Sequence, residues 1–267
     1  MSTLKESDLI FGLMATFNKP EYSIEEFKYL LKPFRISESC LRTTLCRMAA
    51  KNIVQTCKQG RKALYSFTKS GELIKDNIAL GFEKLDWSNW KGNWLGVLFS
   101  IPDLKKQERY NFRKNLLNYR FRPLYPGVWI RPFNSKEDVY SKILKKINKK
   151  LCEVVEINYL EDISREKVVR LWELKEINKK IKQGIKILEK SQRQIKTLSS
   201  AEALVEKMVV GNKIVKILFL DPLLPTIFLP KDWQGGKLKA MFGRWVKTIN
   251  YTAKPYWIKI FRKEEQI

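Results

Sequence analysis

Residues 37–52, SESCLRTTLCRMAAKN, combine apolar and polar side chains at helical spacing. Ser37 is typical of a helix N-cap, and Glu38 suits the positive end of the helix dipole. The spacing predicts one buried stripe, formed by Leu41, Leu45, Met48 and Ala49. Ser39, Thr43 and Arg47 are predicted to project away from this stripe, and Arg42 flanks it. With Lys51, which follows the helix, these are the polar residues predicted to face a ligand.

These polar side chains are of the types that contact DNA. Arginine can donate two hydrogen bonds to guanine O6 and N7, which contributes about 1–3 kcal/mol of discrimination. We therefore expect Thr43 and Arg47 to face base edges in the major groove. Ser39, Arg42 and Lys51 are expected to hold phosphates, which sets the register without reading sequence. The alternative is a helix packed inside a helical domain, with arginines that are merely solvated.

A basic loop follows this helix. Residues 53–57 and 63–68 are β-prone runs, separated by Lys58–Lys62 with the sequence KQGRK. Gly60 permits a tight turn, and the cations Lys58, Arg61 and Lys62 are expected on the phosphate backbone or in the minor groove. The alternative is a basic hairpin tip that lies free in solvent.

The charge of the chain is concentrated in this region. Over 267 residues there are 52 Lys and Arg against 28 Asp and Glu, a net charge of +24. Between Lys28 and Lys69 the only acid is Glu38. A protein this basic usually faces a polyanion such as nucleic acid, an anionic membrane surface or an acidic ligand, although basic solubilising faces are an alternative.

Several kinds of chemistry are disfavoured by composition. The chain has no histidine, which excludes Ser-His-Asp and Cys-His catalysis and histidine-ligated metals. The four cysteines form no C-x-x-C pair, so we expect reduced thiols and a cytoplasmic location. We expect no catalytic residue, no metal and no cofactor.

No membrane segment is expected. Glu6 and Asp8 interrupt the N-terminus where a signal peptide needs an apolar core. The most apolar later stretch, residues 214–230, contains charges and prolines at Lys216, Asp221 and Pro222. It cannot span a bilayer as one helix.

The order of elements predicts an α+β chain of three domains. Residues 1–80 read as three helices and a hairpin, the pattern of a winged helix-turn-helix. Residues 81–163 read as β-α-β-β-α-β, the ferredoxin-like order, with its second helix at 136–150. Residues 164–267 read as helices, the first of them over 165–198, and 221–233 as a proline-punctuated connector.

Three stretches together resemble the PaaX family of bacterial repressors. They are SESCLRTTLCRMAAKNIVQTCKQGRKALYSFTKSG (37–71), WKGNWLGVLFSIPDLKKQERYNFRKNLLNYRFRPLYPGVWIRP (90–132) and DPLLPTIFLPKDWQG (221–235). The resemblance implies a homodimeric transcriptional repressor on a palindromic operator. It implies release from DNA by a small effector, such as the aryl-CoA thioester phenylacetyl-CoA. The central domain in turn resembles the small CRISPR-associated ferredoxin-fold endoribonucleases.

Two departures from these patterns bear on function. Family members tend to carry a histidine and an arginine-rich helix end before the Asp-Pro motif, where this chain has Asn212 and Lys216, so its effector can differ. The related nucleases carry an aspartate where this chain has Ser100, with Asp103 expected at a helix start. A metal-dependent nuclease with a DNA-binding module is therefore an alternative, as is a non-specific nucleic-acid-binding protein.

Two further features each allow two interpretations. The irregular spacing of three tryptophans, Trp87, Trp90 and Trp94, indicates packing between domains rather than stacking on bases or on an aryl ligand. The sequence of the connector 221–233 indicates a rigid segment that seals the C-terminal domain, rather than a wall of an effector pocket. The paired acids Glu161 and Asp162 are expected to be exposed.

Overall fold

A computed structural model describes residues 4–60, 62–83, 85–88, 90–99, 106–134, 151–160 and 163–261. The chain is a mixed α+β protein that divides into two compact units. The first unit holds Met1–Ile78, Ile181–Phe219 and Gly235–Ile267; the second holds Ala79–Lys180 and Leu220–Gln234. Within the described residues, no helix is long and apolar enough to cross a membrane.

The first unit begins with helices α1 (Glu6–Phe17), α2 (Ile24–Leu31) and α3 (Glu38–Ala50). Helix α2 begins with a capping box: the Ser23 side chain accepts from the Glu26 backbone N–H, and the Glu26 carboxylate accepts from the Ser23 backbone N–H. Pro33 lies in a short 3₁₀ turn, Lys32–Phe34, that follows α2.

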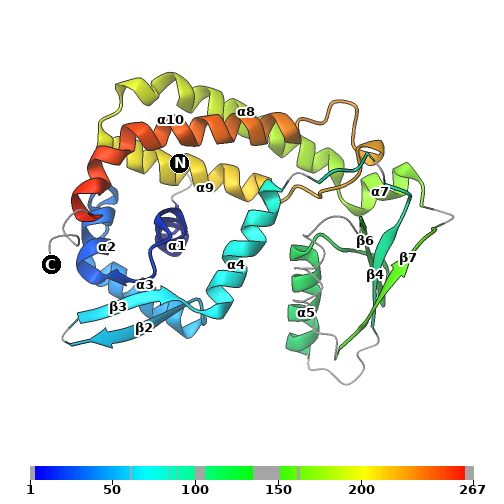
Figure 1. Cartoon of the computed structure of the whole chain (residues 1–267), viewed down its shortest axis with the longest axis horizontal. Coiled ribbons are helices and arrows are strands. Elements are labelled where there is room, and N and C mark those ends of the chain that lie inside the picture. Colours follow the sequence, from blue (N-terminus) through cyan, green and yellow to red (C-terminus); the bar gives the residue numbers. More distant parts are fainter. Residues whose placement is uncertain are drawn as a thin grey trace. The chain divides into compact units, whose positions relative to one another are not determined.

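A three-stranded antiparallel sheet accompanies these helices. Its order is β1-β3-β2, with β1 at Tyr22–Ser23, β2 at Val54–Gln59 and β3 at Lys62–Phe67. β2 and β3 form a hairpin that projects beyond the helices (Figure 1). Pairing continues to Gln59 and Lys62, so the loop expected over 58–62 is shorter than predicted, because both strands extend into it.

Helices from the far end of the sequence complete the first unit. Helix α4 (Lys69–Ala79) follows the hairpin, and the C-terminal part of α8 (Leu174–Gln194) lies alongside α9 (Ser200–Leu218) and α10 (Gly235–Phe261) (Figure 1). The buried Trp245 indole donates to the Ser191 hydroxyl at 2.9 Å, which joins α10 to α8.

Two tyrosines join α10 to α2. The Tyr29 and Tyr256 rings lie 5.0 Å apart, and each hydroxyl donates to the other residue's carbonyl, at 3.2 and 2.8 Å. The C-terminal helices and the N-terminal helices therefore share one packed unit.

The second unit contains a four-stranded antiparallel sheet of order β5-β6-β4-β7. Its strands are β4 (Trp94–Leu98), β5 (Arg122–Tyr125), β6 (Val128–Pro132) and β7 (Glu153–Ile157). Helix α5 (Lys106–Asn118) connects β4 to β5 along the chain, and its Phe112 and Leu116 join the core under the sheet. The helix expected at 136–150 lies outside the described residues.

One predicted helix is wrong. The sequence predicts a single helix from 165 to 198, but the chain breaks after α7 (Arg165–Leu171) and resumes at α8. Glu173 at the break has φ of 53°, a left-handed conformation that ends α7. The buried Trp172 fixes this bend, since its indole donates to the Arg120 carbonyl at 3.2 Å.

Candidate nucleic-acid interface

Helix α3 presents one apolar and one polar side, as its sequence predicts. The Ser37 hydroxyl accepts from the Cys40 backbone N–H at 3.2 Å, which confirms the predicted N-cap. The predicted polar residues of the helix and the residue after it are all exposed: Ser39, Arg42, Thr43, Arg47 and Lys51. They lie opposite the core, so α3 is docked with this side available to a ligand.

The buried stripe of α3 differs from the prediction at one position. Leu41, Leu45 and Met48 are buried as expected, but Ala49 is exposed and Thr44 is buried in its place. The helix is rotated so that position 44 rather than 49 completes the stripe. At 100° per residue both positions flank Leu41 and Met48, so periodicity alone does not decide between them.

The hairpin tip carries the other predicted contacts. Gly60 has φ of 60°, the conformation that a two-residue hairpin turn requires. Lys58 is paired with Ala63, and Lys62 with Gln59, so the two lysines lie on opposite faces of the hairpin; both are exposed. Arg61 lies outside the described residues. The tip can therefore present cations on both of its faces.

The cations of this region fall into two groups. The Glu38 carboxylate accepts from the Arg42 guanidinium at 2.7 Å and contacts the Lys28 ammonium at 3.0 Å. Hydrogen bonds from Arg42 and then Lys28 lower the pKa of Glu38. In contrast, the side chains of Arg47, Lys51, Lys58 and Lys62 have no hydrogen bond or ion pair with any described residue.

This arrangement can contact a polyanion in two ways. The four unpaired cations are available without breaking any contact with a described residue. Arg42 would have to exchange a carboxylate for a phosphate. The role of Glu38 in holding Arg42 was missed from the sequence, although a Glu–Arg pair at i, i+4 is the signal that indicates it.

Other sequence candidates are placed away from this interface or cannot be placed. Ser100, Asp103, Glu161 and Asp162 lie outside the described residues. Lys216 forms an ion pair with Asp8 at 2.7 Å. Among the described residues, no group of three or more histidine, cysteine, aspartate or glutamate side chains could hold a metal.

The tryptophans of the second unit serve packing. Trp90 lies edge-on to both Trp87 and Trp94, at centroid distances of 6.1 and 5.8 Å. Trp94 is 1% exposed and packs on Trp172 and Phe228. The prediction of packing over stacking on a ligand is supported, but these contacts lie inside the second compact unit, not between the two units.

The connector 221–233 is anchored in the same unit. The Asp221 carboxylate accepts from the Leu223 backbone N–H at 3.0 Å, and the Asp221 carbonyl accepts from the Arg120 guanidinium at 2.8 Å. Arg120 is 2% exposed, and burial lowers its pKa to about 10. Leu223, with φ of 54°, turns the chain here.

The fold and its basic N-terminal side define a mixed α+β protein with an exposed cationic helix and hairpin. Comparisons with known proteins identify its family. Three family models match in order: the PaaX-like protein model over residues 9–71, the PaaX protein central Cas2-like domain over 87–169, and the PaaX-like protein C-terminal domain over 172–259. The chain belongs to the PaaX family.

Two relatives illustrate the range of similarity. The transcriptional repressor PaaX of Escherichia coli (strain K12) is 22% identical over 214 residues, which cover 77% of this chain and 67% of that protein. The solved structure of the uncharacterized protein Rv0674 from Mycobacterium tuberculosis matches with a TM-score of 0.56 and 20% identity. That match covers 94% of this chain and 97% of the other, and it shows a shared fold.

Proposed function

We propose that this chain is a transcriptional repressor that binds double-stranded DNA through α3 and the β2–β3 hairpin. The observation that carries the proposal is the exposed face of α3 together with the hairpin tip, where four cations have no partner among the described residues. Membership of the PaaX family and similarity to a transcriptional repressor support the assignment. They favour a regulator over an enzyme.

We assign these elements as a winged helix-turn-helix, with α3 as the recognition helix and the hairpin as the wing. Thr43 and Arg47 would reach base edges in the major groove. Phosphates would be held by the remaining residues of the predicted site, which are Ser39, Arg42, Lys51, Lys58, Arg61 and Lys62.

The second unit supports a ferredoxin-like assignment for its sheet. The strand order β7-β4-β6-β5, all antiparallel, is the order that a β-α-β-β-α-β chain adopts in that fold. We retain 1–80, 81–163 and 164–267 as the proposed domains, with the central one serving dimerisation or effector response.

The proposed regulator is a cytoplasmic homodimer. A two-fold dimer would place its two α3 helices in successive major grooves about 34 Å apart, so the operator would be an imperfect palindrome. The effector, such as an aryl-CoA thioester, would have to bind the DNA-incompetent state more tightly than the competent one.

Genomic footprinting with the purified protein tests the proposal. A repressor of this kind protects a small number of discrete, palindromic sites near promoters. Uniform protection without preferred sites would instead indicate a non-specific nucleic-acid-binding protein. Cleavage of the labelled DNA in the presence of Mg²⁺ or Mn²⁺ would instead favour the nuclease.

A further inference from the structure

The connector of the second unit forms a pocket with the start of α7. The pocket has a volume of about 480 Å³, within the range of small-molecule sites. Its lining combines apolar and cationic side chains: Arg165, Thr226, Ile227, Leu229, Pro230, Lys231 and Trp233. The pocket uses part of the family-specific connector sequence that the DNA interface leaves unexplained.

The frame of this pocket is built from fixed backbone. Ser164 caps α7 by accepting from the Lys167 backbone N–H, which places Arg165 at the first helical position. On the other side, the 3₁₀ turn Thr226–Phe228 is held by Phe228, which packs against Trp90 and Trp94. A backbone hydrogen bond of 3.0 Å from Trp233 to Pro230 closes the turn that carries Lys231. Contacts within the second unit therefore hold the backbone on both sides of the pocket.

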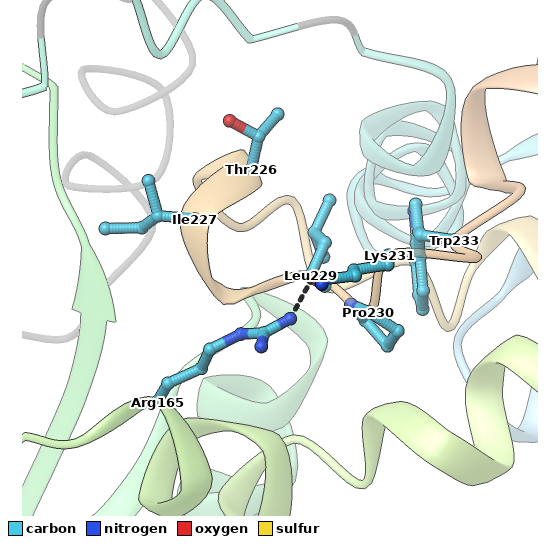
Figure 2. A pocket seen from close by; sticks show the side chains of 7 residues that line it. All are labelled: Arg165, Thr226, Ile227, Leu229, Pro230, Lys231 and Trp233. Atoms are coloured by element: carbon cyan, nitrogen blue, oxygen red, sulfur yellow. Dashed lines mark hydrogen bonds between the residues drawn. The ribbon is translucent and has the colours of Figure 1, made fainter.

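The two cations of the pocket are oriented toward one another. Figure 2 shows Arg165 reaching from α7 toward the connector, and Lys231 pointing from the connector toward Arg165. The Arg165 guanidinium donates to the Leu229 carbonyl at 2.8 Å, which fixes its position and uses only part of its five N–H donors. Neither cation has a carboxylate partner among the described residues.

The acids adjacent in sequence to Arg165 and Lys231 are Glu166 and Asp232, and neither lines the pocket. The Glu166 carboxylate is engaged at the start of α7, where hydrogen bonds from its own backbone N–H and the Ser164 hydroxyl are the largest causes that lower its pKa, and the charge of Arg165 lowers it further. Asp232 follows Lys231 along the chain but does not line the pocket. The charge of the lining is thus positive.

The apolar part of the lining is open to solvent. Ile227 is 63% exposed although it lies on a turn whose neighbour Phe228 is buried. Leu229, Pro230 and Trp233 continue this apolar surface. Burying a side chain such as Ile227 under an apolar group is favourable by roughly 25 cal/mol for each Å² removed from water.

We propose that this pocket binds a small organic anion with an apolar body, whose carboxylate or phosphate lies between Arg165 and Lys231. The apolar body contacts Ile227, Leu229 and Trp233. The inference deepens the effector part of the proposed function, because it gives the effector a site and a chemical class. Binding of the anion is measurable without DNA, so a failure here is distinct from a failure of DNA recognition.

Calorimetric titration of the full-length protein tests the proposal with matched probes. The probes are 3-phenylpropanoate, phenyl phosphate, and the neutral 3-phenylpropanamide, with acetate and inorganic phosphate as anions that lack the apolar body. We expect at least one of the two aromatic anions to bind about tenfold more tightly than the amide, since hydrogen bonds to charged groups contribute about 1.5–3 kcal/mol. Whichever of 3-phenylpropanoate and phenyl phosphate binds more tightly identifies the anionic group as a carboxylate or a phosphate.

Variants locate the binding site. Arg165→Gln and Lys231→Gln should each weaken binding of the preferred anion about tenfold, and Ile227→Asp should abolish it by placing a negative charge in the pocket. Arg170→Gln is the matched control, because Arg170 is an exposed arginine of the same helix outside the pocket lining. Circular dichroism and thermal unfolding verify that each variant is folded.

Three results would overturn the proposal. One is that no aromatic anion binds. A second is equal affinity for the anions and the amide, and a third is equal affinity in the pocket variants and the Arg170→Gln control.

Discussion

Glu38 is the residue that most directly limits the positive charge of α3. It holds Arg42 at 2.7 Å and Lys28 at 3.0 Å, and it is the one acid between Lys28 and Lys69. An acid on a DNA-binding side repels phosphate and competes for the cations that would contact it. A regulator gains from this, since weaker binding to random DNA raises the ratio of specific to non-specific affinity.

The Glu38→Gln variant tests this role. Removing the carboxylate releases Arg42 and Lys28 for phosphates, so affinity for random DNA should rise about threefold or more at low salt. Fluorescence anisotropy with a labelled random duplex measures the change.

Glu72→Gln provides the control for charge alone. Glu72 forms an exposed ion pair with Lys75 on α4 at 2.6 Å, and its replacement changes the net charge equally. If both variants gained the same affinity, the effect would be one of net charge, and Glu38 would have no special position.

At the scale of elements, local sequence patterns predicted most of the N-terminal helices and the hairpin. The cap at Ser37 and the burial of Leu41, Leu45 and Met48 follow from residue types at fixed spacing, and these predictions are confirmed. The choice of Ala49 over Thr44 as the fourth buried position of α3 was wrong. Both residues lie at the edge of the stripe, and the neighbouring helices select between them.

Local sequence patterns did not predict the long-range packing. The contact between Tyr29 and Tyr256 joins residues 227 positions apart, and nothing in the spacing near either residue indicates it. For the same reason the sequence did not indicate that the first compact unit combines segments from both ends of the chain. The pocket residues Arg165 and Lys231 were missed because their proximity depends on how the connector folds back toward α7.

Lys207 shows how the C-terminal helices contribute to stability. This residue of α9 is 9% exposed, and its ammonium lies 4.8 Å from the centre of the Trp257 ring and 5.5 Å from that of Phe17. Burial lowers the pKa of Lys207 to about 8. Below pH 8 the folded protein must therefore keep a charge in a poorly hydrated place, a cost that the two rings offset only in part.

Lys207→Met should stabilise the protein at pH 7, raising the melting temperature by about 2–4 °C for a gain of about 1 kcal/mol. Because the pKa is lower in the folded than in the unfolded state, the wild type gains stability as pH rises from about 8 toward 10.5. The advantage of the variant should therefore shrink over that range. Thermal unfolding at a series of pH values measures both effects.

Lys213→Met, at an exposed position of the same helix, should show neither effect. A variant at position 207 that is less stable than the wild type at pH 7 would show that the aromatic contacts outweigh the cost of burial.

Gly71 marks a close approach between α4 and the turn that follows α3. A β-carbon at this position would lie 2.2 Å from the Ile53 carbonyl oxygen, so the backbone would have to move. Gly71→Ala should reduce the free energy of unfolding by about 1–3 kcal/mol, as measured by urea denaturation.

The same substitution at Gly243 should have the opposite sign. Gly243 lies inside α10, and a β-carbon added there would have no neighbour within 4 Å outside the backbone of its own helix. Alanine should therefore stabilise the protein by about 0.5–1 kcal/mol. Equal effects at the two glycines would contradict the packing described for α4.

At the scale of the whole molecule, the charge distribution governs how binding responds to salt. Six cations in each proposed DNA-binding domain are candidates for phosphate or base contacts: Arg42, Arg47, Lys51, Lys58, Arg61 and Lys62. A protein that makes 6–10 phosphate contacts loses about 10³–10⁵ in affinity between 50 and 200 mM salt. The net charge of +24 is consistent with strong electrostatic attraction to DNA.

We therefore expect a steep, linear decrease of log affinity with log salt concentration for the dimer on a footprinted site. Anisotropy titrations from about 50 to 200 mM KCl measure the slope. A slope equivalent to only about two phosphate contacts would show that the cations of α3 and the hairpin do not contact the backbone.

The central claim is that α3 reads sequence while the hairpin holds the backbone, and paired titrations test it most directly. Wild type, Arg47→Ala and Lys62→Ala are each titrated against a footprinted site and a random duplex at one salt concentration. Arg47→Ala should lose about 1–3 kcal/mol of affinity for the site and much less for random DNA, whereas Lys62→Ala should weaken both about equally. Equal losses on both duplexes for both variants would contradict the assignment of α3 as the reading element.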